Sequence, residues 1–142
     1  MTLPTDGSHV LYVGVSWSVG IAVLLESDEQ ATFQEWQAAV DAALKDPAFR
    51  PGMGVVHDMR RLIRVPTPAE ARARVNFLLG RTRAFQVPRW AIVVSGSAHY
   101  GMGRMAEFLT EETLGDGFRV FRDLPEALEW AHCGSAENGS VA

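Results

Sequence analysis

Two groups of reactive side chains stand directly after short apolar runs of the sequence. Asp58, Arg60 and Arg61 follow the first run. The second run leads into hydroxyl, imidazole and phenol side chains: Ser95, Ser97, His99 and Tyr100. These residue types bind anions or take part in acid–base and nucleophilic catalysis. If both runs are parallel strands, their carboxyl ends meet at one edge of a sheet, where open α/β proteins bind ligands.

A catalytic triad is one possible use of these residues. Ser95 or Ser97 with His99 and Asp58 supplies the necessary residue types. The sequence lacks the Gly-x-Ser-x-Gly turn that exposes the nucleophile in many hydrolases. The residue types alone are common, so the pattern favours a protein that is not an enzyme.

Metal and nucleotide sites find no support in the spacing. The histidines and Cys133 do not follow the spacing of metal ligands. The glycines that follow the second run do not match a P-loop or a dinucleotide-binding turn. We therefore expect no metal and no cofactor. The residues are compatible with an anion site formed by Arg60 or Arg61 and the start of the helix that follows the second run. The simpler alternative is that Asp58 pairs locally and both arginines lie in solvent.

The elements that position these residues follow from hydrophobic periodicity and from helix caps. Thr32 with Glu35, and Thr67 with Glu70, have the spacing of a capping box at a helix start. Strands are predicted at residues 9–15, 19–25, 53–57, 89–95 and 118–122, with a hairpin turn at 16–18. Helices are predicted after Thr32, after Thr67, between the fourth and fifth strands, and at 124–131.

This order predicts one α/β domain over residues 1–133, with a mixed, mostly parallel sheet and an N-terminal β-hairpin. Residues 134–142 are small and polar and are predicted to be a disordered tail. The 142 residues carry a net charge of −4, which does not indicate a nucleic-acid partner. One cysteine, no apolar run long enough to cross a bilayer and no secretory signal indicate a cytoplasmic protein.

Several segments, taken together in their order, resemble the SpoIIAA-like proteins with a STAS/SEC14-type domain. The resemblance is carried by Asp46–Gly52 and Val55–Arg60, then by Trp90–Val93, Tyr100–Met105 and Phe118–Trp130. It implies a bacterial protein with a superhelical fold of successive βα units. Better-known relatives are anti-sigma-factor antagonists switched by serine phosphorylation, and lipid-binding SEC14 domains. Here Val65-Pro66-Thr67-Pro68 replaces the switch-serine sequence, which argues against such a switch.

The helix that begins after Thr67 predicts a self-association surface. Its face away from the core is only weakly polar and contains Phe77 and Gly80, with Arg74 and Arg81 on one flank. The next helix offers Glu107 and Glu111. We therefore expect a homodimer with Phe77 as an apolar anchor and Arg–Glu pairs at its rim. The alternative is a solvated face that forms no interface.

Two functions stay open on the sequence alone. The first is a non-enzymatic STAS-like interaction or regulatory module. The second is a domain that binds a small ligand, an anion or a lipid, at the carboxyl edge of the sheet. An apolar ligand between helices and sheet has candidate lining residues in Trp36, Phe49, Met53, Met102 and Met105.

Overall fold

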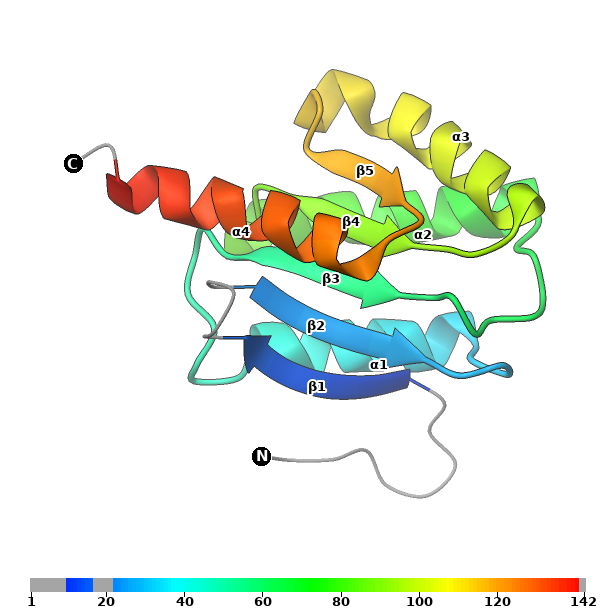
Figure 1. The fold of residues 1–142 in the computed structure, drawn as a ribbon, viewed down its shortest axis with the longest axis horizontal. Helices are drawn as coiled ribbons and strands as arrows, with labels where there is room; N and C mark the ends of the chain where they lie inside the picture. Colours follow the sequence, from blue (N-terminus) through cyan, green and yellow to red (C-terminus); the bar gives the residue numbers. More distant parts are fainter. Residues whose placement is uncertain (1–9, 17–21, 141–142) are drawn as a thin grey trace.

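The computed structural model describes residues 10–16 and 22–140 and places side chains over 23–132. Within them, strands and helices follow the order that the sequence predicts (Figure 1). The strands are β1 (Val10–Ser16), β2 (Ala22–Ser27), β3 (Gly54–Asp58), β4 (Trp90–Val93) and β5 (Phe118–Phe121). The helices are α1 (Phe33–Leu44), α2 (Pro68–Phe85), α3 (Ser97–Leu114) and α4 (Leu124–Ser140). The predicted hairpin turn falls mostly on residues outside the described part of the chain.

The sheet is mixed, as predicted, and its strands stand in sequence order from β1 to β5. β1 pairs with β2 in antiparallel orientation, and every later pair is parallel. A right-handed connection between neighbouring parallel strands places its helix on a fixed face. Because the strands are added in one direction, α1, α2 and α3 all fall on the same face of the sheet.

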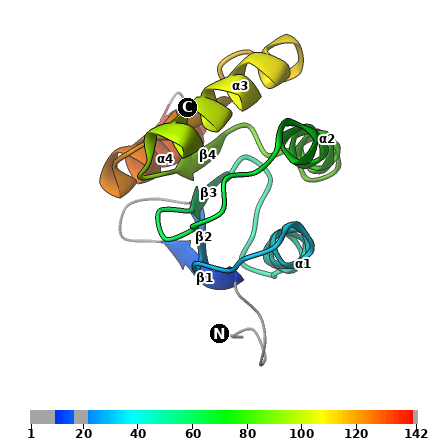
Figure 2. The same ribbon diagram turned by 90° about the vertical axis from the view of Figure 1, so that its right-hand side faces the viewer.

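The opposite face is covered by α4, which lies across the sheet from α1 and α2 in Figure 2. The large core cluster joins the sheet to α1, α2 and α3, with Trp36 and Leu78 among its buried members. A smaller cluster joins Val56 and Phe121 to Ala131 of α4. The sheet therefore separates two apolar cores of unequal size.

β3 lies between these cores and is buried along its whole length, as the non-alternating run predicts. Successive side chains of a strand point to opposite faces. Val55 accordingly belongs to the core beneath α1, α2 and α3, and Val56 belongs to the core beneath α4. His57 follows Val55 on the first of these faces and is 4% exposed.

Both predicted capping boxes are confirmed. The Thr32 hydroxyl accepts from the backbone N–H of Glu35, and the Glu35 carboxylate accepts from the backbone N–H of Thr32. Thr67 and Glu70 form the same reciprocal pair, with Pro68 in the first turn of α2. Each cap satisfies backbone donors that a helix start leaves without partners.

Two glycines permit close approach of helices to the sheet. A Cβ on Gly54 of β3 would lie 2.9 Å from the Cβ of Ala131 on α4. A Cβ on Gly103 of α3 would lie 2.5 Å from a methyl carbon of Val120 on β5. Both helices therefore contact the sheet at distances that exclude even one methyl group.

The C-terminal helix extends into the segment for which the sequence predicts a disordered tail. α4 runs to Ser140, and only 141–142 of that segment lie outside the described residues. Disorder of the tail and the domain boundary at residue 133 stay predictions. None of the described helices is long and apolar enough to cross a membrane.

Candidate functional site

Asp58 and Arg60, two of the predicted ligand-binding residues, form a closed pair at the carboxyl end of β3. The Arg60 side chain donates from Nε and Nη2 to the two carboxylate oxygens, at 2.9 and 2.8 Å. Burial would raise the pKa of Asp58, but the hydrogen bonds from Arg60 outweigh it and leave that pKa below its usual value. Asp58 is therefore an ionised carboxylate whose charge Arg60 already neutralises.

The remaining predicted residues at this edge bond to several different groups. Arg61 pairs with Glu29, with 2.9 Å between nitrogen and oxygen. The Ser95 hydroxyl donates to the backbone carbonyl of Arg60 at 3.0 Å, which ties the end of β4 to the loop after β3. Tyr100 lies under the guanidinium of Arg122, 4.3 Å from its ring centre, and Ser97 is an exposed residue at the start of α3. Both arginines of the predicted anion site thus already contact carboxylates.

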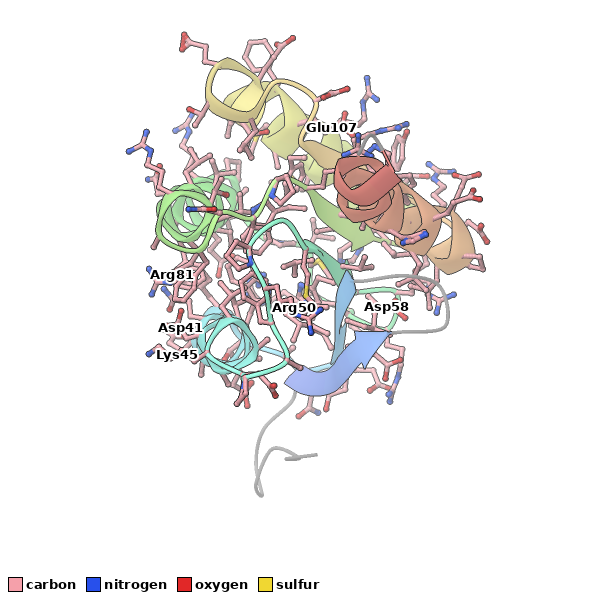
Figure 3. The ribbon with its side chains drawn as sticks, turned by 90° about the vertical axis from the view of Figure 1, so that its left-hand side faces the viewer. Asp41, Lys45, Arg50, Asp58, Arg81 and Glu107 are labelled. Atoms are coloured by element: carbon pink, nitrogen blue, oxygen red, sulfur yellow. The ribbon has the colours of Figure 1, made fainter. Side chains whose placement is uncertain are left out.

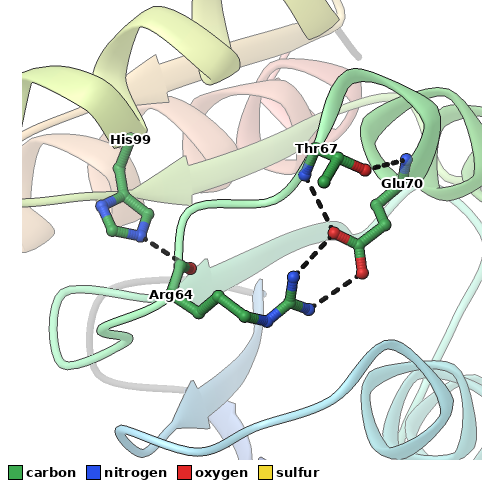
Figure 4. Close-up of polar contacts among 4 residues, drawn as sticks. All are labelled: Arg64, Thr67, Glu70 and His99. Carbon is green, nitrogen blue, oxygen red and sulfur yellow. Dashed lines mark hydrogen bonds and ion pairs between the residues drawn. The ribbon is translucent and has the colours of Figure 1, made fainter.

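The predicted triad residues do not assemble into a catalytic relay. The His99 ring bonds through Nε2 to the carbonyl of Arg64 at 3.1 Å (Figure 4). Asp58 is held by Arg60, and Ser95 bonds to backbone. A relay would need the imidazole between the hydroxyl and the carboxylate. Among the described residues, no group of three or more His, Cys, Asp or Glu side chains could hold a metal ion.

A cavity lies instead beneath the three helices that share one face of the sheet. Its volume is about 70 Å³. Apolar side chains form most of its wall: Val55, Met59, Val75, Leu78, Trp90, Ile92, Val94, Met102, Ala106 and Phe118. Pro66 and His99 line it where the loop after β3 meets the start of α3. Of the predicted apolar lining residues, Trp36 and Met102 contribute to the wall, whereas Phe49, Met53 and Met105 do not.

Three nitrogen atoms of cavity-lining residues have no hydrogen-bond partner among the residues that the structure describes. They are Nε1 of Trp36, Nδ1 of His57 and Nε of Arg74, and all three are buried. In the described part of the chain, His132 on α4 carries the fourth such atom. Buried polar groups in folded proteins are nearly always paired, because an unpaired one costs about 1 to 3 kcal/mol. Their concentration around one cavity marks this place as the candidate site.

His57 reaches the cavity wall in its neutral form. Burial, followed by the charge of Arg74, lowers the pKa of His57 to about 3. Its Nε2 shares a buried hydrogen bond with the Ser27 hydroxyl on the neighbouring strand β2. The ring stacks on Trp36, with 6.1 Å between ring centres. A neutral imidazole has one donor and one acceptor nitrogen, so Nδ1 offers whichever role Nε2 does not use.

Arg74 brings a positive charge to the same wall. Its guanidinium lies 5.2 Å from the ring centre of Trp36 and 5.6 Å from that of Phe33. Burial lowers the pKa of Arg74 to about 10, so the group remains protonated at neutral pH. Stacking occupies the faces of the guanidinium, whereas its N–H donors lie in the plane of the group.

The predicted interface residues lie differently from expectation. The prediction that Phe77 faces away from the core is wrong, because Phe77 packs edge-on against Trp36 of α1. Arg81 stacks on Phe77 and pairs with Asp41 of α1, and Figure 3 shows both charged side chains between the two helices. Gly80 is exposed, as predicted.

The acidic half of the predicted interface lies on α3. The Glu107 carboxylate accepts from the backbone N–H of Val120 at 2.8 Å and pairs with Arg104 of the same helix. Glu111 is exposed. Self-association through α2 and α3 remains an untested prediction. Its proposed apolar anchor contributes instead to the contact between α1 and α2.

Arg74 is a predicted rim residue of the interface, although its spacing along α2 indicates the face toward the core. Arg74 comes three residues after Ala71 and four before Leu78, and both of these are buried. Residues at such intervals share one helical face. The charge of Arg74 favours the edge of the core face, whereas its spacing places it on that face.

Comparisons with known proteins support the fold and leave the activity open. No protein family model and no curated protein matches the sequence. The structure is similar to an uncharacterised protein from Shewanella loihica PV-4, a member of the DUF3478 family with a SpoIIAA-like fold. The TM-score is 0.58 at 16% identity, over 92% of this chain and 99% of that one. The predicted architecture is thereby confirmed: this chain has a SpoIIAA-like fold.

Proposed function

We propose that this SpoIIAA-like domain is a non-enzymatic, STAS-like regulatory module that responds to a small ligand held in the cavity beneath α1, α2 and α3. The observation that carries the proposal is the set of three buried, unpartnered nitrogens on one mostly apolar wall. An empty apolar cavity is lined by apolar groups alone, and in a well-packed core the buried polar groups are hydrogen-bonded. The unpartnered nitrogens fit neither case. A ligand with an apolar body and a polar end satisfies both parts of this wall.

The absence of a relay among Ser95, His99 and Asp58 supports a binding role over catalysis. Each of these side chains is bonded to a different group. The cavity also lies next to the carboxyl ends of β3 and β4, where open α/β sheets bind ligands.

The test is a fragment screen by two-dimensional NMR on the full chain. Ligands of the cavity are expected to shift amide signals of its lining residues, with few changes on α4. Ala106 lines the cavity, and Ala106→Leu adds about the volume of three methylene groups, so it is expected to abolish these shifts. Ala98→Leu, at an exposed position of α3, is the matched control. A diverse screen without any cavity-directed shift would refute the proposal.

Self-association is a second candidate, and one observation on α3 supports it. Phe108 is 75% exposed between Arg104, Glu107 and Glu111. A face with both charge signs around an apolar residue can pair with a second copy of itself. Light scattering after size-exclusion chromatography tests it, with Phe108→Glu as the disrupting variant. A monomer at high protein concentration would exclude this candidate.

A further inference from the structure

The charge of Arg74 is not matched by a carboxylate within the described part of the chain. Arg60, Arg61, Arg64, Arg81 and Arg104 each lie within ion-pair distance of an acid. Beside the guanidinium of Arg74 lie the rings of Trp36 and Phe33. Arg74 is partly buried, and its Nε is buried without a hydrogen-bond partner among the described residues. A desolvated cation without a counter-charge is unfavourable, so this part of the cavity wall favours an anion.

The nearest candidate counter-ion, Glu70, is committed elsewhere. It lies one helical turn before Arg74, and its charge acts on Arg74 only through space. Its two carboxylate oxygens accept from Arg64 at 2.7 and 2.9 Å, and one of them also accepts from the backbone N–H of Thr67 (Figure 4). These bonds, that from Arg64 first, lower the pKa of Glu70 to about 2. The carboxylate thus stays ionised at the helix start, outside the cavity wall.

The other unpartnered atoms favour an acceptor beside the cation. The indole N–H of Trp36 and the Nε–H of Arg74 can only donate. His57 Nδ1 donates when the Ser27 hydroxyl donates to Nε2. A carboxylate offers two oxygens in one plane, which fits the planar donors of a guanidinium.

The remaining wall of the cavity determines the chemical character of the rest of the ligand. It is built from aliphatic, methionine and aromatic side chains, such as Val75, Met102 and Phe118. The cavity of about 70 Å³ is smaller than one that holds benzene, so only a few heavy atoms fit inside it without rearrangement. Because one cation faces the cavity, a monoanion balances it and a phosphate dianion does not.

We propose that the cavity binds a monocarboxylate with an apolar body, its carboxylate paired with Arg74 and accepting from the indole of Trp36. This inference rests on the proposed function and adds the chemical class of the ligand. The carboxylate belongs either to a short free acid or to the end of a longer acyl chain.

The test compares acids with amides of the same shape on the full-length protein. Butanoate, hexanoate, decanoate and benzoate are titrated against their amides, with inorganic phosphate as a further comparison. NMR follows the indole N–H of Trp36 and the Nε–H of Arg74. Each acid that binds is expected to do so at least 10-fold more tightly than its amide, and phosphate is expected not to bind. A preference for butanoate indicates a short acid, and a preference for decanoate indicates an acyl chain.

Variants and ligand comparisons test the carboxylate assignment separately from the proposed ligand-binding function. Arg74→Gln is expected to reduce acid affinity at least 10-fold while amide affinity changes less than 2-fold. Arg72→Gln, on the exposed side of the same helix, is expected to change neither. Equal affinity of acids and amides for the wild type would overturn the carboxylate assignment and leave the cavity a neutral-ligand site. If neither acids nor amides shift the lining residues while other fragments do, the ligand class is wrong. If no fragment shifts them, the proposed function fails as well.

Discussion

The guanidinium of Arg81 on α2 donates two hydrogen bonds to the carboxylate of Asp41 on α1, at 2.6 and 3.0 Å. It also lies 4.1 Å from the ring centre of Phe77. This cluster joins α1 and α2, which also meet where Arg74 stacks on Trp36 and Phe33.

Asp41→Asn and Arg81→Gln are expected to lower the free energy of unfolding, and Arg81→Gln more so because it also removes the contact with Phe77. A double-mutant cycle by urea unfolding is expected to give a coupling of about 0.5 to 1 kcal/mol, as for other partly exposed pairs. The more exposed Arg61–Glu29 pair is the control, with a coupling near zero. Additive effects at Asp41 and Arg81 would show that the pair contributes nothing.

The same pair predicts a pH dependence. Hydrogen bonds from Arg81 lower the pKa of Asp41 below its unfolded-state value. The unfolded chain therefore binds the proton more readily, and the stabilisation is complete above the unfolded pKa of about 3.9. It is lost as the pH falls through the lower pKa of the folded state. Asp41→Asn is expected to show a smaller loss of stability than the wild type in this acidic range.

His57 predicts a second pH dependence at higher pH. Its pKa is about 3 in the folded protein, against about 6.5 in the unfolded chain. Above pH 6.5 both states are neutral at this residue, so stability is not affected. Below pH 6.5 the imidazole is protonated in the unfolded state but not in the folded state. The free energy of unfolding therefore decreases by about 1.4 kcal/mol for each unit by which the pH is lowered.

Urea unfolding of the wild type and His57→Gln between pH 7.5 and 5.0 measures this contribution. The variant is expected to have the shallower dependence on pH, whatever its stability at pH 7.5. Parallel pH profiles of the two proteins would contradict the burial of a neutral imidazole.

Gly103 predicts a steric effect on stability. The added Cβ of Gly103→Ala would meet Val120, and relief requires α3 to move away from the sheet. We expect a destabilisation of about 1 to 3 kcal/mol, as for other overpacked cores. Gly101→Ala on the same helix meets nothing within 4 Å and is expected to raise stability by about 0.5 to 1 kcal/mol. Thermal unfolding measures both, and equal effects would refute the close approach.

The cap of α2 gives a fifth prediction. Thr67→Ala removes the hydroxyl that accepts from the backbone N–H of Glu70. The expected loss of stability is about 1 kcal/mol. Thr113→Ala, at an exposed position of α3, serves as the control and is expected to change stability by less than about 0.5 kcal/mol. A loss confined to Thr67→Ala supports the cap, and similar losses would argue against it.

Local patterns were sufficient to predict the fold. The Thr–Glu spacing located the starts of α1 and α2, because a capping box depends on residues only three apart. The unbroken apolar run around Val55 and Val56 indicated a strand buried on both faces. The alternation of strands and helices then predicted a mostly parallel sheet, whereas the order of its strands is known only from the structure.

The candidate site depended on contacts between distant segments. Phe77 is covered because α1 lies beside α2, and the sequence of α2 does not indicate which helix packs against it. The bond between Ser27 and His57 depends on the parallel pairing of β2 and β3. Arg61 and Glu29 are likewise brought together by the fold. For Arg74 the helical spacing indicates the core face, whereas its charge alone indicates the edge of that face.

The position of α4 on the far face of the sheet affects folding during synthesis of the chain. The core beneath α1, α2 and α3 can close progressively as each βα unit leaves the ribosome. The other face of the sheet is covered only when α4 has been synthesised, because Ala127 and Ala131 follow all five strands in the sequence. The side chains that α4 covers are those of Val56, Ala91, Val93 and Phe121. A nascent chain that stalls before α4 therefore exposes an apolar strip across three strands, and such a surface is a target for chaperones and a cause of aggregation.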